Sequence, residues 1–415
     1  MVRSGAGGLR AFRRRLHAHP ELSGQETATA RRVVERLEQA GAARVVTGLG
    51  SMQTGVCAVY EGRQKGPGVL VRCELDALPI QERNRFEHRS TVPGVAHLCG
   101  HDGHMATLVA LAGDLGANPI DRGRVFLLFQ PAEETGAGAV AVLEDPRFRA
   151  LGDPDYVYAL HNVPKFPLGT VLLREGVFAQ GSVGFIVNFA GRTSHASYPE
   201  HGVSPSAAVA RLVTAVDAFG TSLAGKVAAP VLGTISFARI GRAETGPNFG
   251  TAPGEACVSG VLRAQRSTDL ELLRAELSEL AARLAAESGL AHSLSWHEAF
   301  AATASDAGCV AVVRDAARRL GLEVRELDEP FRWSEDFGHF TAAFPGAFFG
   351  LGSGIDQPQL HDDGYDYPDG LIETGARLFR AIIDRHLEDR PPVDRLQDDR
   401  RGHRAPARSG RPPGS

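Results

Sequence analysis

The chain has 415 residues, more than one ordinary hydrophobic core accommodates, so its length predicts two domains. Hydrophobic residues make up 43% of it and charged residues 23%, as in soluble globular proteins. The formal net charge of −4 gives no electrostatic reason for binding to polyanions. We therefore expect neither nucleic acid nor a membrane among its partners.

The N-terminus lacks the apolar run that is typical of a signal peptide. No segment approaches the ~18 consecutive apolar residues of a membrane span. The five cysteines show no tight paired spacing, which argues against a disulfide framework and suits a reducing compartment. These features predict a cytoplasmic protein.

The first part of the chain alternates predicted helices and short apolar strands. Apolar residues at helical spacing predict a helix over 24–41, and a second helical stretch covers 104–115. Apolar segments typical of buried strands lie at 55–60, 68–72, 125–129 and 156–160. This alternation predicts an α/β domain with a mixed, mostly parallel sheet and helices on both faces.

Residues 179–299 show a different order of predicted elements. Two helices and four strands follow in the order strand 183–190, helix 204–219, strand 233–240, strand 255–263, helix 268–288 and strand 293–298. This β-α-β-β-α-β order is typical of a ferredoxin-like unit with two layers. We therefore expect an inserted domain at 179–299, which divides a discontinuous catalytic domain into 1–178 and 300–388.

The last third of the chain returns to α/β character. It contains a predicted helix over 306–320, a strand over 347–351 and an amphipathic helix over 369–387. Residues 389–415 are rich in Arg, Asp, Pro and Gly and hold few large apolar side chains. Such a segment cannot bury enough surface to offset its ordering entropy, so we expect a disordered tail.

A thiol and two imidazoles stand close together in the segment Cys99-Gly-His101-Asp102-Gly-His104. Cys99 and His101 are two residues apart and cannot share a helix face, but a turn can bring both to one cation. The two glycines permit such a turn, and Asp102 is available to orient a ligand. Either residue alone would more often be a buried thiol or a hydrogen-bonded imidazole, so the combination favours a metal site.

Glu133 and Glu134 follow an almost entirely apolar predicted strand. Two adjacent glutamates are usually a solvated surface pair, yet the apolar approach indicates that these lie at the mouth of a core. Adjacent side chains of an extended segment point to opposite sides. One carboxylate can then bind metal while the other acts as general base, and the residues alone leave open which does which.

Other polar side chains also follow predicted strands. Glu74 and Asp76 come after the strand at 68–72, and His161 comes directly after the strand at 156–160. Ligands of parallel sheets gather at the carboxyl ends of the strands, so these residues and the glutamate pair predict one shared site. His361 is a further candidate ligand, whereas His195 lies in the inserted domain and by itself would be a surface histidine.

Together these motifs resemble the M20 metallopeptidase superfamily, in particular its aminoacylase-like amidohydrolase branch of hippurate hydrolases, N-acyl amino acid amidohydrolases and auxin-conjugate hydrolases. The resemblance covers roughly residues 9–388, with several separate motifs in the family's order. These motifs are Arg14–Glu21, Glu74–Pro79, Cys99–His104, Phe129–Glu134, His161, Ser194–Ser197, Ser334–Phe337 and Leu360-His361.

The resemblance implies a general base at Glu133 and two divalent metal ions, Mn²⁺ or Zn²⁺. It implies that His195 polarises the scissile carbonyl or holds the substrate, in some relatives from the lid of the partner subunit. The inserted domain would then be a lid that forms a homodimer, with Arg263 near the substrate carboxylate. The implied metal ligands are Cys99, His101, Glu134, His161 and His361.

Two positions depart from the pattern of this branch. Glu74 stands where the branch usually has Asp, and its longer side chain can shift the groups around the metal, although Asp76 is kept. The lid asparagine normally lies three residues before a proline, which is Gly250 counted from Pro253. Asn248, two positions earlier, is the candidate substrate contact instead.

We therefore predict a metal-dependent amidohydrolase that cleaves an N-acyl amino acid into a carboxylic acid and a free amino acid. A dipeptidase or carboxypeptidase of the same superfamily is the nearest alternative. A thiol hydrolase with Cys99 as nucleophile and His101 as base has poor geometry and leaves the other donors unexplained. A non-catalytic, metal-stabilised binding protein is the alternative outside enzymes. The acyl group and the amino acid cannot be read from the sequence.

Overall fold

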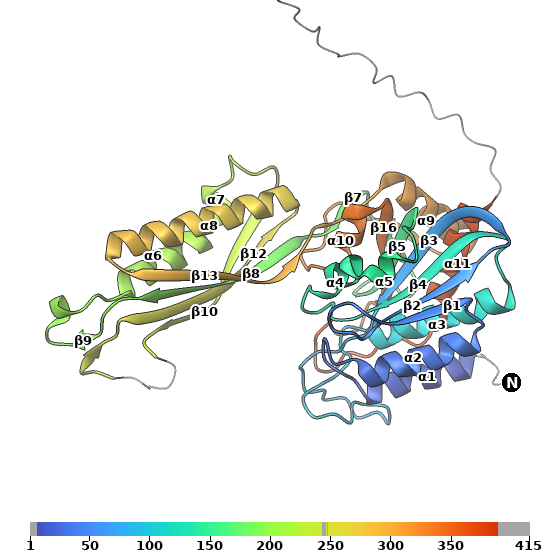
Figure 1. The fold of residues 1–415 in the computed structure, drawn as a ribbon, viewed down its shortest axis with the longest axis horizontal. Helices are drawn as coiled ribbons and strands as arrows, with labels where there is room; N and C mark the ends of the chain where they lie inside the picture. Colours follow the sequence, from blue (N-terminus) through green and yellow to red (C-terminus); the bar gives the residue numbers. More distant parts are fainter. Residues whose placement is uncertain (1–5, 243–245, 247, 389–415) are drawn as a thin grey trace, which may run out of the picture.

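The computed structural model describes residues 6–242, 246 and 248–388, so the predicted tail at 389–415 lies outside the described residues. The described chain forms a large lobe and a small lobe, joined by extended segments (Figure 1). The large lobe holds an eight-stranded sheet and the small lobe a four-stranded sheet. None of the helices in the described part of the chain is long and apolar enough to cross a lipid bilayer.

The eight-stranded sheet of the large lobe is mixed, with a parallel centre. Its order is β1-β2-β4-β3-β5-β16-β6-β15. The central strands β4, β3, β5 and β16 run parallel, whereas β1 and β2 are antiparallel additions at one edge. The strands are β1 (Arg44–Leu49), β2 (Gly55–Glu61), β3 (Gln64–Glu74), β4 (Arg122–Gln130), β5 (Tyr156–Pro164), β6 (Val171–Leu173), β15 (Val324–Glu326) and β16 (Gly346–Gly354).

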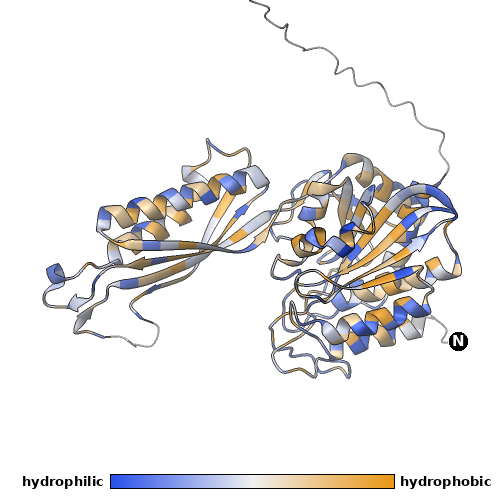
Figure 2. Cartoon of the chain, viewed as in Figure 1, coloured by the Kyte–Doolittle hydropathy of each residue, from blue (hydrophilic) through white to orange (hydrophobic). Residues whose placement is uncertain are grey.

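Helices cover both faces of this sheet, which confirms the predicted fold class. One face packs on α1 (Ala6–Ala18), α2 (Thr27–Gln39), α3 (His101–Ala117), α9 (Ala307–Arg319) and α11 (Leu371–Leu387). The other face packs on α4 (Gly138–Glu144), α5 (Pro146–Arg149) and α10 (Gly338–Ala343). Because both faces are buried, the central strands are apolar along most of their length (Figure 2).

The side chains of strand β4 alternate between the two hydrophobic clusters on the two faces of the sheet. Val125, Leu127 and Phe129 belong to the cluster that contains α1, α2 and α3. Phe126 and Leu128 belong to the cluster on the opposite face. The strand therefore has no polar side, and it delivers the chain to the glutamate pair just beyond its end.

The four-stranded sheet of the small lobe has the order β10-β12-β8-β13 with antiparallel pairing throughout. This is the ferredoxin-like topology that the sequence predicts. One face packs on the two helices, and the side chains of the other face stay partly exposed. The main elements are β8 (Gly181–Ala190), α6 (Ser206–Asp217), β10 (Val231–Ile240), β12 (Glu255–Ala264), α8 (Ser267–Ser288) and β13 (Ala291–Phe300).

Smaller elements complete the two lobes. Strands β7 (Gly176–Ala179) and β14 (Thr303–Ser305) pair where the chain leaves and re-enters the large lobe. The small lobe also contains β9 (Ser194–His195), a 3₁₀ turn (Pro199–His201), α7 (Phe219–Ser222) and β11 (Thr251–Ala252). The elements of the small lobe lie close to the predicted range 179–299, and the division into domains with these boundaries stays a prediction.

Two predicted elements differ from the structure next to the predicted ligands. Helix α3 begins at His101, three residues before the predicted start, because the carbonyl of its N-cap Gly100 already accepts a hydrogen bond from His104 N at 3.1 Å. Strand β5 continues through His161 to Pro164, so this histidine lies within the strand and not after it. Its continued pairing with β16 explains the extra length.

Candidate active site

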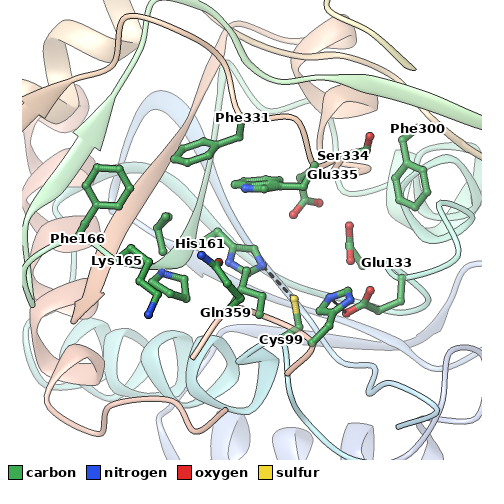
Figure 3. A pocket seen from close by; sticks show the side chains of 16 residues that line it. Cys99, Glu133, His161, Lys165, Phe166, Phe300, Phe331, Ser334, Glu335 and Gln359 are labelled. Carbon is green, nitrogen blue, oxygen red and sulfur yellow. Dashed lines mark hydrogen bonds and ion pairs between the residues drawn. The ribbon is translucent and has the colours of Figure 1, made fainter. Parts of the chain in front are cut away.

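The five predicted metal ligands come from four separate segments of the large lobe, and the structure brings their donor atoms together. Ligand atoms of Cys99, His101 and His161 lie within 4.8 Å of one another, as do those of Cys99, Glu134 and His361. The Cys99 Sγ lies 3.4 Å from His161 Nε2 (Figure 3). The Oε1 atom of Glu134 lies 3.6 Å from His361 Nε2 and 3.9 Å from His101 Nε2.

The His101 imidazole is held from behind, so that one nitrogen faces the other donors. Its Nδ1 lies 2.9 Å from the backbone oxygen of Asp76 and 3.5 Å from the Asp76 carboxylate. Burial lowers the pKa of His101, but the hydrogen bond to Asp76 and the charges of Glu74 and Glu134 raise it to about 10. This environment favours a positive charge at Nε2, which a bound cation supplies as well as a proton does.

Two donor atoms of the cluster are buried without a hydrogen-bond partner among the described residues. They are His101 Nε2 and Glu134 Oε1. A buried polar atom without a partner is costly, and a metal ion between these atoms would satisfy both. The donor set of one thiol, three imidazoles and a carboxylate is also suited to a divalent transition metal. The residues therefore fit a metal site.

His161 and Cys99 form the soft side of the cluster. The Nδ1 of His161 donates to the backbone oxygen of Asn162 at 2.9 Å, which leaves Nε2 free to bind metal. Burial and the neighbouring His104 lower the pKa of His161 well below its ordinary value, so the ring is neutral. Burial and the charges of Glu134 and Glu133 raise the pKa of Cys99 well above its ordinary value. A thiolate at Cys99 therefore requires a nearby cation.

The glutamate pair does not point to opposite sides as the sequence predicts. Both carboxylates line the same cavity, and Glu133 Oε2 lies 4.0 Å from His101 Nε2. The prediction assumed an extended segment, but the pair lies in a turn that follows Ala132, whose φ is 52°. Burial and the like charges of Glu335 and Glu134 raise the pKa of Glu133 well above its ordinary value. Burial raises the pKa of Glu134 to about 7.

Asp102 does not orient a metal ligand, which corrects the sequence-based expectation. Its Oδ2 accepts hydrogen bonds from His17 Nδ1 at 2.9 Å and from Arg13 Nη1 at 3.2 Å. On helix α3 it follows His101 directly, so the two side chains leave the helix in different directions. Asp76 orients the His101 ring instead. Its position beyond the end of an apolar strand, two residues after Glu74, is a sequence signal for this role.

The Glu74 side chain reaches a buried network beside the cluster. Its Oε2 lies 2.6 Å from His104 Nδ1, and its other oxygen pairs with Arg72. Arg72 also pairs with Glu335 at 2.8 Å and with Asp336. These contacts and the charge of His104 hold the pKa of Glu74 well below its ordinary value, although burial opposes this. Arg72 is a functional candidate that the motifs do not reveal, although a charged residue inside an apolar strand is a signal for one.

The small lobe is the part of the chain that the sequence predicts to be a lid. Two of the three predicted residues of this lid do not reach the cluster in a single chain. His195 is exposed on β9, at the end of the small lobe that lies away from the large lobe (Figure 1). Asn248 lines a separate cavity of the lid, and its Oδ1 accepts from Gly250 N at 2.9 Å. The backbone of His195 pairs with that of Thr251, three residues after Asn248, so His195 and Asn248 lie in the same part of the lid.

Arg263 occupies the opposite end of the lid, next to the large lobe. Its Nη1 donates to Ser334 Oγ at 2.9 Å and to the backbone oxygen of Arg332 at 3.0 Å. Ser334 lines the cavity at the metal cluster. Burial lowers the pKa of Arg263 from its ordinary value. Arg263 therefore lies close to the site within its own chain.

The cluster opens into a cavity of about 400 Å³ with an aromatic wall. Phe331 and Trp333 are stacked with ring centroids 5.0 Å apart, and Trp333 lies 5.6 Å from the ring of His161. Phe166 and Phe300 line the cavity on its other sides (Figure 3). The cavity thus combines metal-binding donors and carboxylates at its base with apolar rings around them.

Comparison with known proteins identifies relatives along most of the chain. The profile of peptidase family M20/M25/M40 matches residues 70–385. The chain is 30% identical over 354 residues to an N-acetyl-L-cysteine deacetylase of Bacillus subtilis, covering 85% of this chain and 82% of that protein. It is 28% identical over 384 residues to a hippurate hydrolase of Campylobacter jejuni, covering 92% and 97%.

A solved structure agrees with these sequence relatives. The crystal structure of the Bacillus subtilis YXEP protein, described as a dinuclear metal binding peptidase from the M20 family, matches with a TM-score of 0.76 at 25% identity. The match covers 93% of this chain and 99% of that one. The chain therefore belongs to peptidase family M20/M25/M40, which confirms the resemblance seen in its motifs. It is a metal-dependent hydrolase that acts on amide bonds.

Proposed function

We propose that the protein hydrolyses N-acyl amino acids to a carboxylic acid and a free amino acid. The names of its relatives, a deacetylase of N-acetyl-L-cysteine and a hippurate hydrolase, support this substrate class. The observation that carries the proposal is the convergence of four of the five candidate ligands and a second carboxylate on one cavity, with His101 Nε2 within 4.0 Å of both glutamates. This arrangement is what metal-assisted amide hydrolysis requires.

Cys99, His101, Glu134, His161 and His361 would hold two divalent ions. The thiol and imidazoles favour Zn²⁺, and Mn²⁺ is the second candidate. When bound, such ions polarise a carbonyl group and lower the pKa of water. The similarity to the YXEP protein, a dinuclear metal binding peptidase, supports the number of ions.

Glu133 would act as the general base. Its carboxylate lines the cavity beside the ligands, and its raised pKa suits a group that takes a proton from water and returns it to the leaving amine. Asp336 N approaches Glu133 Oε1 at 3.4 Å, which restricts the carboxylate on one side. Glu134 lies between His101 and His361 and is therefore the better placed of the pair to bind metal.

The lid would complete the site from a second copy of the chain. His195 lies on β9 at the outer part of the lid, away from the cluster of its own chain, and the segment of Asn248 is bonded to the same part through Gly250. We therefore propose a homodimer in which the lid of each copy brings His195 to the cavity of the other, to polarise the scissile carbonyl. Arg263 would bind substrate from within the same chain, next to Ser334. A cytoplasmic location stays a prediction from the sequence.

The aromatic wall supports a flat, apolar acyl group as the preferred one. Phe331 and Trp333 present stacked rings beside the donors, and apolar rings gain little from contact with an acetyl group. An N-benzoyl amino acid would bury its ring against this wall. The thiol alternative is disfavoured because Cys99 has His161, a candidate ligand, as its imidazole neighbour and a pKa raised above its ordinary value.

A hydrolysis screen tests the proposal. The chain is stripped of metal, reloaded separately with Mn²⁺ and Zn²⁺, and offered N-acetyl amino acids, N-benzoyl amino acids and dipeptides. We expect metal-dependent release of the free amino acid, with N-benzoyl substrates ahead. Preference for dipeptides would favour the dipeptidase alternative. Activity that survives chelation and is lost on thiol alkylation would contradict the metal mechanism, and tight metal binding without hydrolysis would favour a binding protein.

A further inference from the structure

Glu26 is a buried carboxylate that contacts the turn carrying the glutamate pair. It is fully buried, and its Oε1 accepts hydrogen bonds from Gly24 N at 2.8 Å and from Ala132 N at 2.9 Å. Its Oε2 accepts from Thr54 Oγ1 at 2.8 Å. Burial and the neighbouring Asp76 carboxylate raise the pKa of Glu26. Burying a carboxylate in surroundings that disfavour its charge costs free energy, so we expect Glu26 to have a structural or functional role that offsets this cost.

Helix capping does not supply that reason. Glu26 occupies the N-cap position of α2, but its side chain makes no capping hydrogen bond. The first turn of α2 is instead satisfied by Glu21, which accepts from Ala28 N at 3.1 Å and from Thr29 N at 2.7 Å. Two carboxylates thus lie at one helix start, and only Glu21 serves the helix. Glu26 is left to bind the turn across from it.

The turn that Glu26 contacts has an unfavourable backbone conformation. Ala132 has φ of 52°, a left-handed conformation that is unfavourable for a residue with a Cβ atom. This conformation bends the chain after β4, so that Glu133 and Glu134 both face the cavity. The Ala132 amide is held by Glu26, and its carbonyl accepts from Gly138 N at 3.1 Å. The surroundings therefore fix the strained residue on both sides.

We propose that Glu26 is a positioning residue that holds Ala132 in its left-handed conformation and thereby aims Glu133 and Glu134 into the same cavity. The inference rests on the proposed roles of these two glutamates in metal binding and hydrolysis. Glu26 touches neither the cavity nor the donor atoms, so it acts only through the turn.

A second contact from the same segment agrees with this role. Ser23 Oγ donates to Asp76 Oδ2 at 2.7 Å, and the same oxygen accepts from Glu134 N at 3.0 Å. Asp76 in turn holds the His101 ring. The stretch from Ser23 to Glu26 thus supports the glutamate turn directly at the Ala132 amide and, through Asp76, at the Glu134 amide.

The test compares Glu26→Ala, Glu26→Gln and the control Glu21→Ala. Glu26→Ala should lower the affinity for Zn²⁺, measured by calorimetry on the metal-free protein, and kcat, each by about 10- to 100-fold, because Glu134 and Glu133 lose their orientation. KM should change little, since the aromatic wall is untouched. Glu26→Gln keeps an oxygen for the two backbone amides, so it should restore both quantities to within about threefold of the original chain.

The control separates positioning from general loss of stability. Glu21→Ala removes the helix cap and should lower the melting temperature by about 2–4 °C, with metal affinity and kcat unchanged. Metal affinity and kcat within twofold of the original in Glu26→Ala would overturn the inference. A loss of the same size in Glu21→Ala would overturn it as well. If the original chain binds Zn²⁺ yet hydrolyses no substrate, the proposed function fails, and the calorimetry still decides the role of Glu26.

Discussion

The candidate functional residues of the two lobes differ in burial and in hydrogen bonding. In the large lobe the candidate ligands His101 and His161 are buried and are oriented by hydrogen bonds. In the lid His195 is exposed, and its ring accepts only from the nearby Ser197 N at 3.1 Å among the described residues. The candidate ligands of the large lobe are thus held in place for metal binding, whereas His195 of the outer lid is exposed to solvent. This difference is the basis for the proposed role of His195 in the active site of a second copy of the chain.

Removal of a ligand should have the largest effect in this comparison. His161→Ala takes away a buried donor beside Cys99, so metal content and turnover should both fall to background. His19 is an exposed histidine of the same lobe, and His19→Ala should leave both unchanged. Metal analysis by mass spectrometry and a hydrolysis assay measure the two properties. Full metal content in His161→Ala would remove this residue from the ligand set.

Removal of the lid histidine should abolish most of the turnover without affecting the metal. We expect His195→Ala to lose about 10²- to 10³-fold in kcat, as for loss of a group that stabilises an oxyanion. Metal content should stay as in the original chain, because His195 lies outside the cluster. His297→Ala, at another exposed lid histidine, is the control.

Mixed dimers decide whether the lid acts on its own chain or on its partner. His195→Ala and Glu133→Gln chains, each inactive alone, are unfolded and refolded together. If the lid acts across the dimer, about a quarter of the original turnover should return, since half of the dimers are mixed and each has one complete site. No recovery in verified mixed dimers would place His195 in the site of its own chain.

The aromatic wall should affect choice of substrate more than rate. Trp333→Ala removes a ring beside His161 and should lower kcat/KM for N-benzoyl substrates by about 10- to 30-fold, with a much smaller change for N-acetyl substrates. The chain has one other tryptophan, Trp296, which packs in the lid and does not line the cavity. Trp296→Ala should therefore keep the preference. Equal losses for both substrates in Trp333→Ala would place the acyl group elsewhere.

A buried histidine should make the large lobe lose stability in alkaline solution. Burial lowers the pKa of His17, but the charge of Asp102 and the hydrogen bonds to Asp102 and Glu82 raise it to about 9. The protonated form therefore stabilises the fold fully below the unfolded pKa of about 6.5, and this contribution is lost as the pH rises through 9. Its size is on the order of 3 kcal/mol.

Denaturant unfolding at pH 6.5 and pH 9.5 measures this effect. The free energy of unfolding should fall between these values in the original chain, and less in His17→Gln, where the titrating group is absent. An equal fall in the free energy of unfolding between the two pH values in both proteins would show that the pKa of His17 is not raised.

Much of the fold could be predicted from the sequence, and so could the proximity of the candidate ligands, whose role in metal binding stays a prediction. Strands such as β4 are apolar on both faces, and their ends mark where polar side chains collect. The order of elements in 179–299 likewise predicted the topology of the lid sheet, because period and spacing are local properties.

What could not be predicted depends on backbone conformations and on contacts between distant segments. The left-handed turn at Ala132 reversed the expected divergence of Glu133 and Glu134, and no local pattern predicts φ > 0 at an alanine. Asp76, and not Asp102, orients His101, because Asp102 lies in the first turn of α3 and its side chain bonds His17. Glu26 lies more than a hundred residues from the turn that it contacts, so its role emerges only from the fold.

The most direct test of the central claim is the Glu133→Gln variant, assayed for bound metal and for turnover of an N-benzoyl amino acid on the same sample. We expect the metal content of the original chain together with a loss of turnover of at least about 10²-fold, because the ligands remain and the base is gone. Retained turnover would contradict the assignment of Glu133 as the base. Loss of metal together with turnover would instead show that Glu133 is itself a ligand.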